Sequence, residues 1–261
     1  MESAARRPEA WLVVLASISL AAWSMLAFGG GDLTLPAFCS AGALWTAPPS
    51  LSLDLALVLN SPAKLAADWA LMVAAMMSPL LVAPLRHVRD RSFVRRRPRA
   101  MLLFIAGYAA VWMIAGAALQ AIALAALWAA PAPILCLALA AITAMVWQVS
   151  PAKQWCLNRC HRQPQLAAFG AAADRDAFHF GLTNGASCAG ACWALMLLTL
   201  FVGHAHLWAM IAVTLFVFAE RLESPAPPAW RWRGAGKALR IAIAQTRMRL
   251  APQSRLREVS P

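Results

Sequence analysis

The sequence predicts an all-α integral membrane protein: a polytopic bundle of six transmembrane helices with both chain ends on the cytoplasmic side. Three observations predict this fold. Hydrophobic residues make up 61% of the chain, charged residues only 13%, and the apolar residues gather in long uninterrupted runs. Because soluble domains carry about 25% charged residues, a single soluble core cannot absorb this much apolar surface. An outer-membrane barrel is excluded, since its strands would alternate apolar and polar residues.

Six apolar runs approach the roughly 20 residues that a helix needs to cross the hydrocarbon core. Within lipid, every backbone polar group must find its partner inside the segment, so we expect all six to be helices. In chain order the runs are Trp11–Phe28, Asp68–Leu85, Met101–Trp128, Ile134–Val149, Phe180–Val202 and Leu207–Arg221. Pro79 lacks a backbone donor, and we expect it to bend the second helix beside the methionines.

The basic residues lie almost entirely on one side of these predicted spans. Of the 23 lysines and arginines, only Lys64 falls on the opposite side. Loops rich in lysine and arginine are retained in the cytoplasm, which predicts a multi-pass protein of the bacterial inner membrane. The net charge of +12 therefore reflects topology. We expect the lipid bilayer and its anionic head groups as partners, and no nucleic acid.

The chain divides into a transmembrane bundle over residues 1–224 and a basic cytoplasmic tail over residues 225–261. The boundary is the helix-breaking segment Pro225–Pro228. Beyond it, the residues that share one helical face are largely apolar, namely Leu239, Ile243, Thr246 and Leu250. This pattern is typical of an amphipathic helix lying on the inner leaflet. A disordered basic tail is the alternative.

Sulfur-bearing residues recur at helical spacing in two of the predicted spans. In the second span Met72 and Met76 are four residues apart, and in the fifth Cys188, Cys192 and Met196 continue that interval. Residues four apart lie on one helical face. At about 1.5 Å per residue, the middle members of the two stripes reach a similar depth near mid-membrane. If the two helices are neighbours, their sulfur atoms can converge.

Two further observations bear on this convergence, one on helix packing in the fifth span and one on ligand chemistry. Gly181 and Gly185 form a small-residue surface that lets another helix approach closely. Thioethers and thiols are soft ligands that favour Cu(I), with Zn(II) the less favoured ion. The alternative is packing alone, because methionine fills irregular gaps and free cysteine behaves as a small buried hydrophobe.

A second cysteine motif lies at the cytoplasmic end, where Cys156 and Cys160 are followed by His161. Helical spacing puts both sulfurs on one side, and the neighbouring Arg159 and Arg162 should favour thiolates by lowering the cysteine pKa values. We expect this group to form the cytoplasmic end of a metal path, or else to stabilise its loop by packing.

The segments described above resemble those of bacterial proteins known as predicted metal-binding integral membrane proteins, a family of unknown function. The resemblance covers roughly residues 68–222. It rests on Trp69–Pro79, Gly107-Tyr108 with Trp112, Lys153–Cys160, and the segment from Gly181 to Leu222 that holds Cys188, Cys192, Met196 and Glu220. It implies a bound metal.

We therefore expect a membrane protein that handles a soft transition metal, copper before zinc, as a transporter or as a chaperone that supplies a metalloenzyme or another membrane subunit. The chain contains no nucleotide-binding loop and no hydrolase constellation, so we expect no enzymatic activity. Two alternatives remain open: a membrane thiol-redox protein that uses one of the cysteine pairs, and a non-catalytic accessory subunit of a membrane complex.

Overall fold

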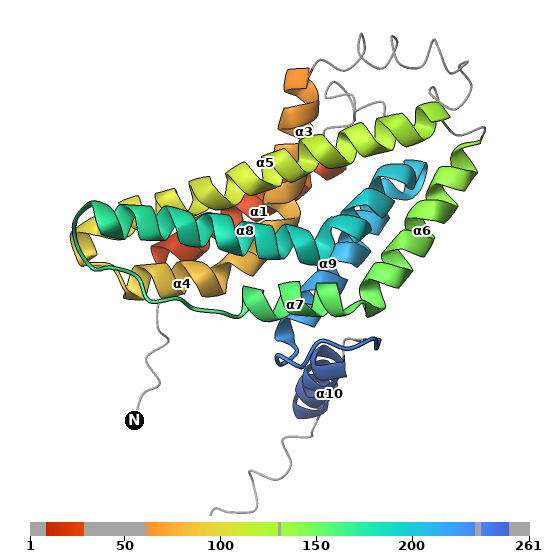
Figure 1. Cartoon of the computed structure of the whole chain (residues 1–261). Coiled ribbons are helices and arrows are strands. Elements are labelled where there is room, and N and C mark those ends of the chain that lie inside the picture. The colour runs from red at the N-terminus through yellow and green to blue at the C-terminus, as the bar shows by residue number, and fades with distance from the viewer. Residues whose placement is uncertain (1–8, 29–61, 130–131, 233–235, 251–261) are drawn as a thin grey trace, which may run out of the picture.

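The structure is a computed structural model that describes residues 9–28, 62–129, 132–232 and 236–250. These residues form helices and connecting turns, with no strand among them, which confirms the all-α prediction. Figure 1 shows the helices, which are α1 (Ala10–Phe28), α3 (Pro62–Met77), α4 (Val82–Asp90), α5 (Arg97–Ala129), α6 (Pro133–Val149), α7 (Pro151–Cys160), α8 (Gly170–Phe201), α9 (His206–Leu222) and α10 (Gly236–Leu250).

Each of the six predicted spans falls on helical residues. Four helical segments are long and apolar enough to cross a membrane: α1, the α3–α4 segment Pro62–Asp90, the segment Val94–Leu127 that contains most of α5, and α8. Helix α6 qualifies only together with α7, from which it is bent by 66°. Four to five helices can therefore cross a membrane, and the arrangement of six spans with both ends in the cytoplasm stays a prediction.

The second predicted span changes its helical geometry at Pro79. Helix α3 ends at Met77, a 3-10 turn covers Ser78–Leu81, and α4 begins at Val82. One tight turn thus interrupts the α-helical pattern at Pro79, because proline cannot supply the α-helical hydrogen bond. The expected bend of the helix stays a prediction. Helix α1 packs along this segment, where the Ser19 hydroxyl donates to the Ala75 carbonyl at 2.9 Å.

Helix α8 is the central element of the bundle. It packs against α5, α6, α7 and α9, and 72% of its most apolar stretch is buried, compared with 17–39% in the other three candidate spans. In Figure 1 α5 and α8 run beside each other along most of their length. The C-terminal half of α8 is surrounded in this way, so the sulfur side chains of Cys188, Cys192 and Met196 face protein.

The contact between α5 and α8 is made by glycines through which the two backbones nearly touch. A Cβ atom on Gly181 would lie 2.2 Å from the Phe104 carbonyl oxygen, and one on Gly107 would lie 2.4 Å from the Phe178 carbonyl oxygen. On Gly185 a Cβ atom would lie 3.1 Å from the backbone carbonyl oxygen of Tyr108. The predicted close-contact surface at Gly181 and Gly185 is therefore confirmed.

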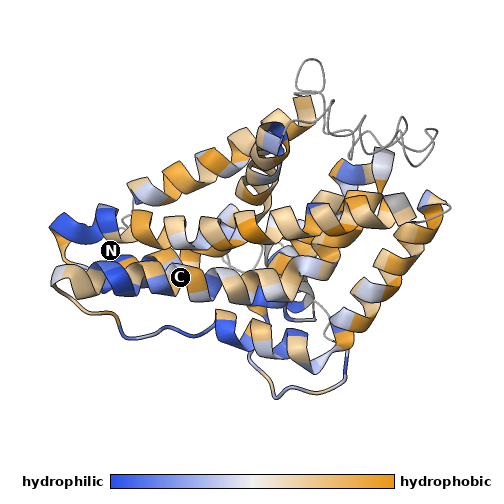
Figure 2. Cartoon of the chain, turned by 45° about the horizontal axis from the view of Figure 1, so that its top comes forward, coloured by the Kyte–Doolittle hydropathy of each residue, from blue (hydrophilic) through white to orange (hydrophobic). Residues whose placement is uncertain are grey.

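The outer faces of the bundle are apolar. Figure 2 shows hydrophobic residues along the long helices and hydrophilic residues towards their ends. Large apolar side chains stand exposed on several helices, among them Leu20, Leu102, Ile114, Leu139 and Leu215. Exposed apolar surface of this extent marks contact with a partner or a membrane, which is compatible with a membrane protein.

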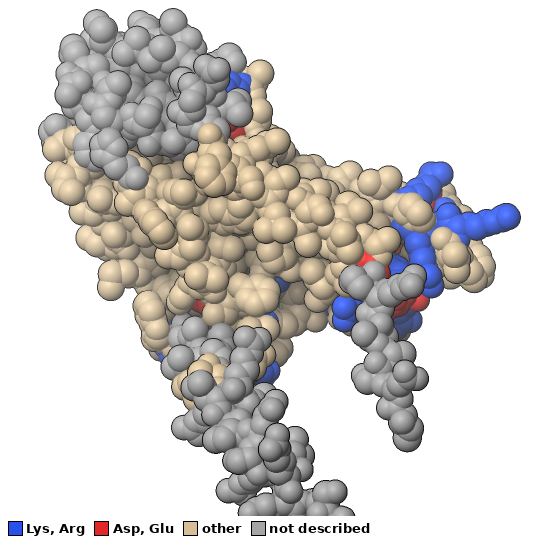
Figure 3. Space-filling view, turned by 180° about the vertical axis from the view of Figure 1, so that it is seen from behind, with Lys and Arg blue, Asp and Glu red and all other residues tan. Residues whose placement is uncertain are grey.

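Basic side chains gather at one end of the molecule, as Figure 3 shows. Here the α4–α5 turn meets the start of α8, and Asp174 accepts from Arg96 at 2.9 Å and from Arg99 at 2.7 Å. On the same side the chain leaves α9 and returns over α7, where Asn158 and Ala226 exchange two hydrogen bonds of 2.7 and 3.3 Å. The predicted helix in the tail is present as α10, and its contact with lipid stays a prediction.

Filling the space at Gly181 should separate α5 from α8. We expect Gly181→Leu to lower the free energy of unfolding by about 3 kcal/mol, because its side chain would overlap backbone atoms that cannot rotate away. The measurement is an SDS titration in mixed micelles. Ala186→Leu is the matched control, since Ala186 lies on the exposed face of the same helix. Equal stability of the two variants would contradict the proposed contact.

Candidate metal centre

The sulfur stripe of α8 faces the interior of the bundle. Asn184, Cys188, Cys192 and Met196 are 5%, 1%, 1% and 0% exposed, as expected for residues that share one helical face. The four-residue spacing read from the sequence thus corresponds to one continuous buried row. It begins with an amide near the middle of the helix and ends with a thioether towards its C-terminal end.

The two thiols of this row form the nucleus of the candidate site. The side chains of Cys188 and Cys192 are hydrogen-bonded to each other, and the Tyr108 hydroxyl donates to the Cys188 sulfur at 3.2 Å. Tyr108 reaches this position because α5 approaches α8 so closely beside Gly185. A phenol that donates to sulfur orients one of its lone pairs and leaves the others for a metal ion.

A guanidinium completes the surroundings of Cys188. Arg221, in the last turn of α9, is hydrogen-bonded to the Cys188 side chain. Its Nε atom is buried without a hydrogen-bond partner among the described residues. A buried donor of this kind costs free energy unless something accepts from it.

The methionines of α3 lie in the same core as the thiols. Met72 and Met76 are 4% and 1% exposed and belong to the contiguous cluster that contains Cys188, Cys192 and Met196. Helix α3 packs against α5 and α9, the helices that carry Tyr108 and Arg221. The convergence of all five sulfur atoms on one ion stays a prediction.

Helix α7 brings the second pair of cysteines against α8. A Cβ atom on Gly190 would lie only 2.8 Å from the Cys156 sulfur, so this thiol rests on the backbone between Cys188 and Cys192. Cys160 lies near enough to Cys188 and Arg221 to interact with both electrostatically. The sequence motif and the α8 stripe are therefore parts of one neighbourhood.

The expectation that nearby arginines would activate this second pair is wrong. Burial raises the pKa of the Cys156 thiol and raises that of Cys160 to about 12. The Arg159 guanidinium stacks over the Trp155 ring at 4.4 Å. Desolvation opposes the charged thiolate more strongly than the guanidinium favours it, so both thiols hold their protons more firmly than a free cysteine does.

His161 is engaged by the backbone on both sides of its ring. Nδ1 lies 2.9 Å from the Leu157 carbonyl oxygen and Nε2 lies 3.1 Å from the Arg221 carbonyl oxygen. With carbonyl oxygens at both nitrogens, the ring offers no free lone pair to a metal in this arrangement. His161 instead joins the end of α7 to the end of α9 and holds Arg221 in place.

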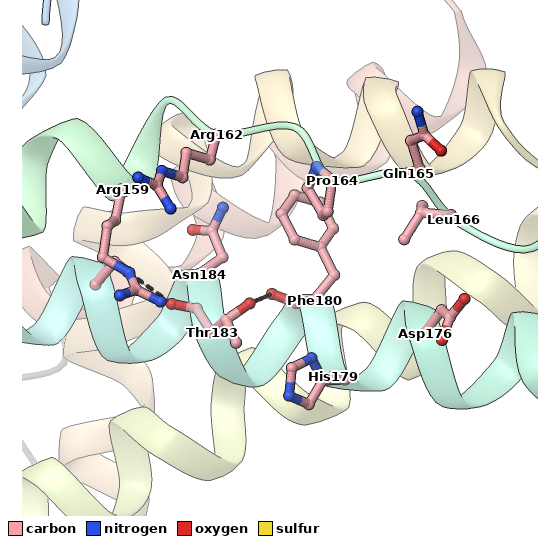
Figure 4. A pocket seen from close by; sticks show the side chains of 11 residues that line it. Arg159, Arg162, Pro164, Gln165, Leu166, Asp176, His179, Phe180, Thr183 and Asn184 are labelled. Carbon is pink, nitrogen blue, oxygen red and sulfur yellow. Dashed lines mark hydrogen bonds between the residues drawn. The ribbon is translucent and has the colours of Figure 1, made fainter.

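Two cavities lie on the α7 side, next to the helix that carries the thiols, although neither Cys188 nor Cys192 lines them. One, of about 300 Å³, lies between α8 and the segment after α7, and Figure 4 shows Arg159 and Arg162 reaching over Thr183 and Asn184. The other, of about 320 Å³, is lined among others by Cys160, His161, Asn184 and Arg221. Both include Asn184, one helical turn before Cys188. A third cavity, near Trp69 and Gln120, is apolar and includes none of the candidate ligands.

A buried ion pair between α7 and α9 lies beside the site. The Lys153 ammonium lies 2.8 Å from both carboxylate oxygens of Glu220, and the two side chains are 2% and 1% exposed. Gln148 donates to Glu220 and accepts from Lys153. The network joins α6, α7 and α9, and Lys153 interacts electrostatically with Cys192.

Within the described parts of the chain, no three His, Cys, Asp or Glu side chains are grouped so that they could hold a metal ion. The soft donors in this part of the protein are therefore the thiols of Cys188 and Cys192, with methionine thioethers in the same core. Such a set suits Cu(I), which accepts few and soft ligands, better than Zn(II), which takes four.

Comparison with known proteins agrees with this chemistry. Residues 66–243 match the copper chaperone family PpoB2. The chain belongs to this family. The match supports the metal-related character of the resemblance drawn from the sequence, but it names a different family from the one expected there. No curated protein and no solved structure matches the chain.

No pattern in the sequence marks Tyr108 or Arg221 as a residue of the site. Tyr108 lies 80 positions before Cys188, and Arg221 reads as one more basic residue at the end of a span. The available clue was that Lys153 and Glu220 fall at the ends of apolar segments, where a buried charge needs a partner of opposite sign.

Breaking the ion pair between Lys153 and Glu220 should destabilise the fold around the site. We expect Lys153→Met to lower the free energy of unfolding by about 3–5 kcal/mol, because the Glu220 carboxylate would be left buried without its counter-charge. The double variant Lys153→Met/Glu220→Gln should regain most of that loss. SDS titration of both variants in mixed micelles provides the measurement. A double variant as unstable as the single one would show that charge pairing is not the reason.

Proposed function

We propose that this protein is a membrane-embedded copper chaperone that holds Cu(I) as cargo on Cys188 and Cys192. The observation that carries the proposal is the buried thiol pair beside Tyr108 and Arg221, in a chain of the copper chaperone family. Two thiols with thioethers in the same core are the soft donors that Cu(I) favours. Met72, Met76 and Met196 are the proposed thioether ligands.

The family match favours a chaperone over a transporter. The cavity on the α7 side that is lined by Cys160 and Arg221 offers the proposed cargo an approach to the site from that face. The proposed acceptor is a copper enzyme or another membrane subunit.

The proposed setting is the bacterial inner membrane, crossed six times with both termini in the cytoplasm. The basic cluster of Figure 3 and the exposed Trp230 and Trp232 beside α10 support contact with a lipid surface. In this orientation the α7 cavities open towards the cytoplasm, where thiols remain reduced and copper is present as Cu(I).

Replacing the thiol pair tests the binding site. We expect Cys188→Ser/Cys192→Ser to lose stoichiometric Cu(I) binding in an anaerobic titration of the purified full chain against a chromophoric chelator. Cys136→Ser is the matched control, since Cys136, on α6, is also buried but donates to the Ala126 carbonyl on α5. Leucine at Met72, Met76 or Met196 should weaken binding without abolishing it. Unchanged copper content in the double serine variant would disprove the site.

The cysteines of α7 can be tested separately as a relay. We propose that Cys156 and Cys160 accept the ion from the inner pair, one ligand at a time, on its way to the acceptor. In Cys156→Ser/Cys160→Ser we expect Cu(I) still to bind at the inner pair, and its transfer to a competing chelator to slow by about tenfold or more. Transfer at the normal rate would leave α7 with a packing role only.

A further inference from the structure

The cavity of about 300 Å³ between α8 and the segment after α7 contains cationic and polar groups that the proposed copper site does not use. Its lining includes Arg159, Arg162, Thr183 and Asn184. Figure 4 shows both arginine side chains above the stretch of α8 that carries Thr183 and Asn184. Neither arginine forms an ion pair with a carboxylate among the described residues. Two positive charges therefore face this end of the cavity without a paired anion.

The position of one of these charges is fixed by an aromatic ring. The Arg159 guanidinium lies over the Trp155 ring, 4.4 Å from its centroid. Stacking of this kind uses the flat face of the guanidinium and leaves the N–H donors at its edge for a ligand. Arg162 is exposed in the segment that follows α7, so its longer reach can adjust to what Arg159 holds.

The one carboxylate that lines this cavity lies away from the two arginines. Asp176 accepts from the Ala167 backbone N–H at 3.0 Å. It precedes Asn184 by eight positions on α8, which corresponds to about 12 Å along a helix. In Figure 4 Asp176 stands at the opposite end of the cavity from Arg159. The end of the cavity beside Asn184 is therefore positively charged.

Asn184 indicates that a ligand belongs at this end. Its side chain is only 5% exposed, yet its amide has no hydrogen-bond partner among the described residues. In Figure 4 the amide points towards Arg159 and Arg162. A buried amide without a partner costs free energy, which a ligand that accepts from it would recover. Because arginine only donates, the group that completes this site must be an acceptor, and the charges require an anion.

We propose that Arg159, Arg162 and Asn184 form a binding site for a phosphate group, supplied by the head group of an anionic phospholipid or by free phosphate. Guanidinium groups present forks of N–H donors that match phosphate oxygens, and these hydrogen bonds are charge-assisted. A phosphate has enough oxygens to accept from both arginines and the amide at once, whereas a carboxylate offers two oxygens to three donor groups. The site is independent of the proposed copper ligands.

The position of the site along α8 favours the phospholipid as the source. The charged residues of α8 all lie in its first turns, and the helix contains no charged residue from Phe180 to Phe201. Thr183 and Asn184 follow directly after this boundary. In the proposed inner-membrane orientation, the boundary lies at the level of the cytoplasmic head groups, where anionic lipids are concentrated.

Thermal unfolding of the metal-free full chain in a neutral detergent tests the site without involving copper. The ligands are phosphatidylglycerol, phosphatidylcholine with the same acyl chains, and inorganic phosphate at constant ionic strength. A ligand that binds only the folded chain raises the melting temperature as its concentration rises. We expect phosphatidylglycerol to do so and phosphatidylcholine, whose choline cancels the charge, to have little effect. A comparable rise with inorganic phosphate would assign the site to free phosphate.

Substitutions of the arginines locate the effect. We expect Arg159→Gln/Arg162→Gln to weaken phosphatidylglycerol binding by about a hundredfold, because two charge-assisted contacts are lost. Arg91→Gln/Arg95→Gln is the matched control, since it removes the same charge from exposed positions between α4 and α5, outside the cavity. Arg162→Gln alone changes an exposed side chain, so it should fold normally and lose about tenfold.

Three results would overturn the inference. The first is a wild-type protein that neither phosphatidylglycerol nor inorganic phosphate stabilises. The second is an affinity that stays unchanged in both Arg162→Gln and the cavity double variant. The third is an equal loss in the control double variant, which would show that general surface charge, and not the cavity, attracts the lipid. Copper binding enters none of these measurements, so the proposed function stands or falls separately.

Discussion

A lysine cannot lie inside an apolar bundle without a counter-charge, and the pairing of Lys153 with Glu220 meets this requirement. The rest of the site depends on this interaction. It joins residues 67 positions apart and fixes α7 against α9, while Gln148 brings the end of α6 into the same network. Because Arg221 follows Glu220 in the same helix, the ion pair also sets the position of the guanidinium next to Cys188. Because both charges are desolvated, any shift of α9 along its axis would separate them at a high cost in free energy. The ion pair therefore fixes the position of α9.

The contact between α5 and α8 is the second interaction that positions the residues around Cys188. Helices associate in a membrane through close packing rather than through the hydrophobic effect, and glycine allows the closest approach. At Gly181 and Gly185 the α5 backbone lies against that of α8, and the phenol of Tyr108 consequently reaches a sulfur on the neighbouring helix. Two independent constraints, one electrostatic and one steric, thus converge on Cys188 from opposite sides.

Sequence reasoning found the parts of the fold that depend on local patterns. Apolar runs located the helices, and the interval of four placed Cys188 and Cys192 on one helical face, which is buried in the structure. It could not find partners that are distant in the sequence, because no periodicity links Tyr108 or Arg221 to Cys188. It also misjudged the thiols of α7. The neighbouring arginines are visible in the sequence, whereas the burial that outweighs them exists only in the folded chain.

Gly190 lies where α6, α7 and α8 meet. The Cys156 sulfur occupies the space where a side chain would begin, and the Trp147 indole donates to the Gly190 carbonyl at 3.0 Å from the α6 side. A methyl group at this position would meet that sulfur, so the thiol would have to turn away from α8. The missing side chain therefore lets the Cys156 thiol lie directly against the helical turn that links Cys188 to Cys192.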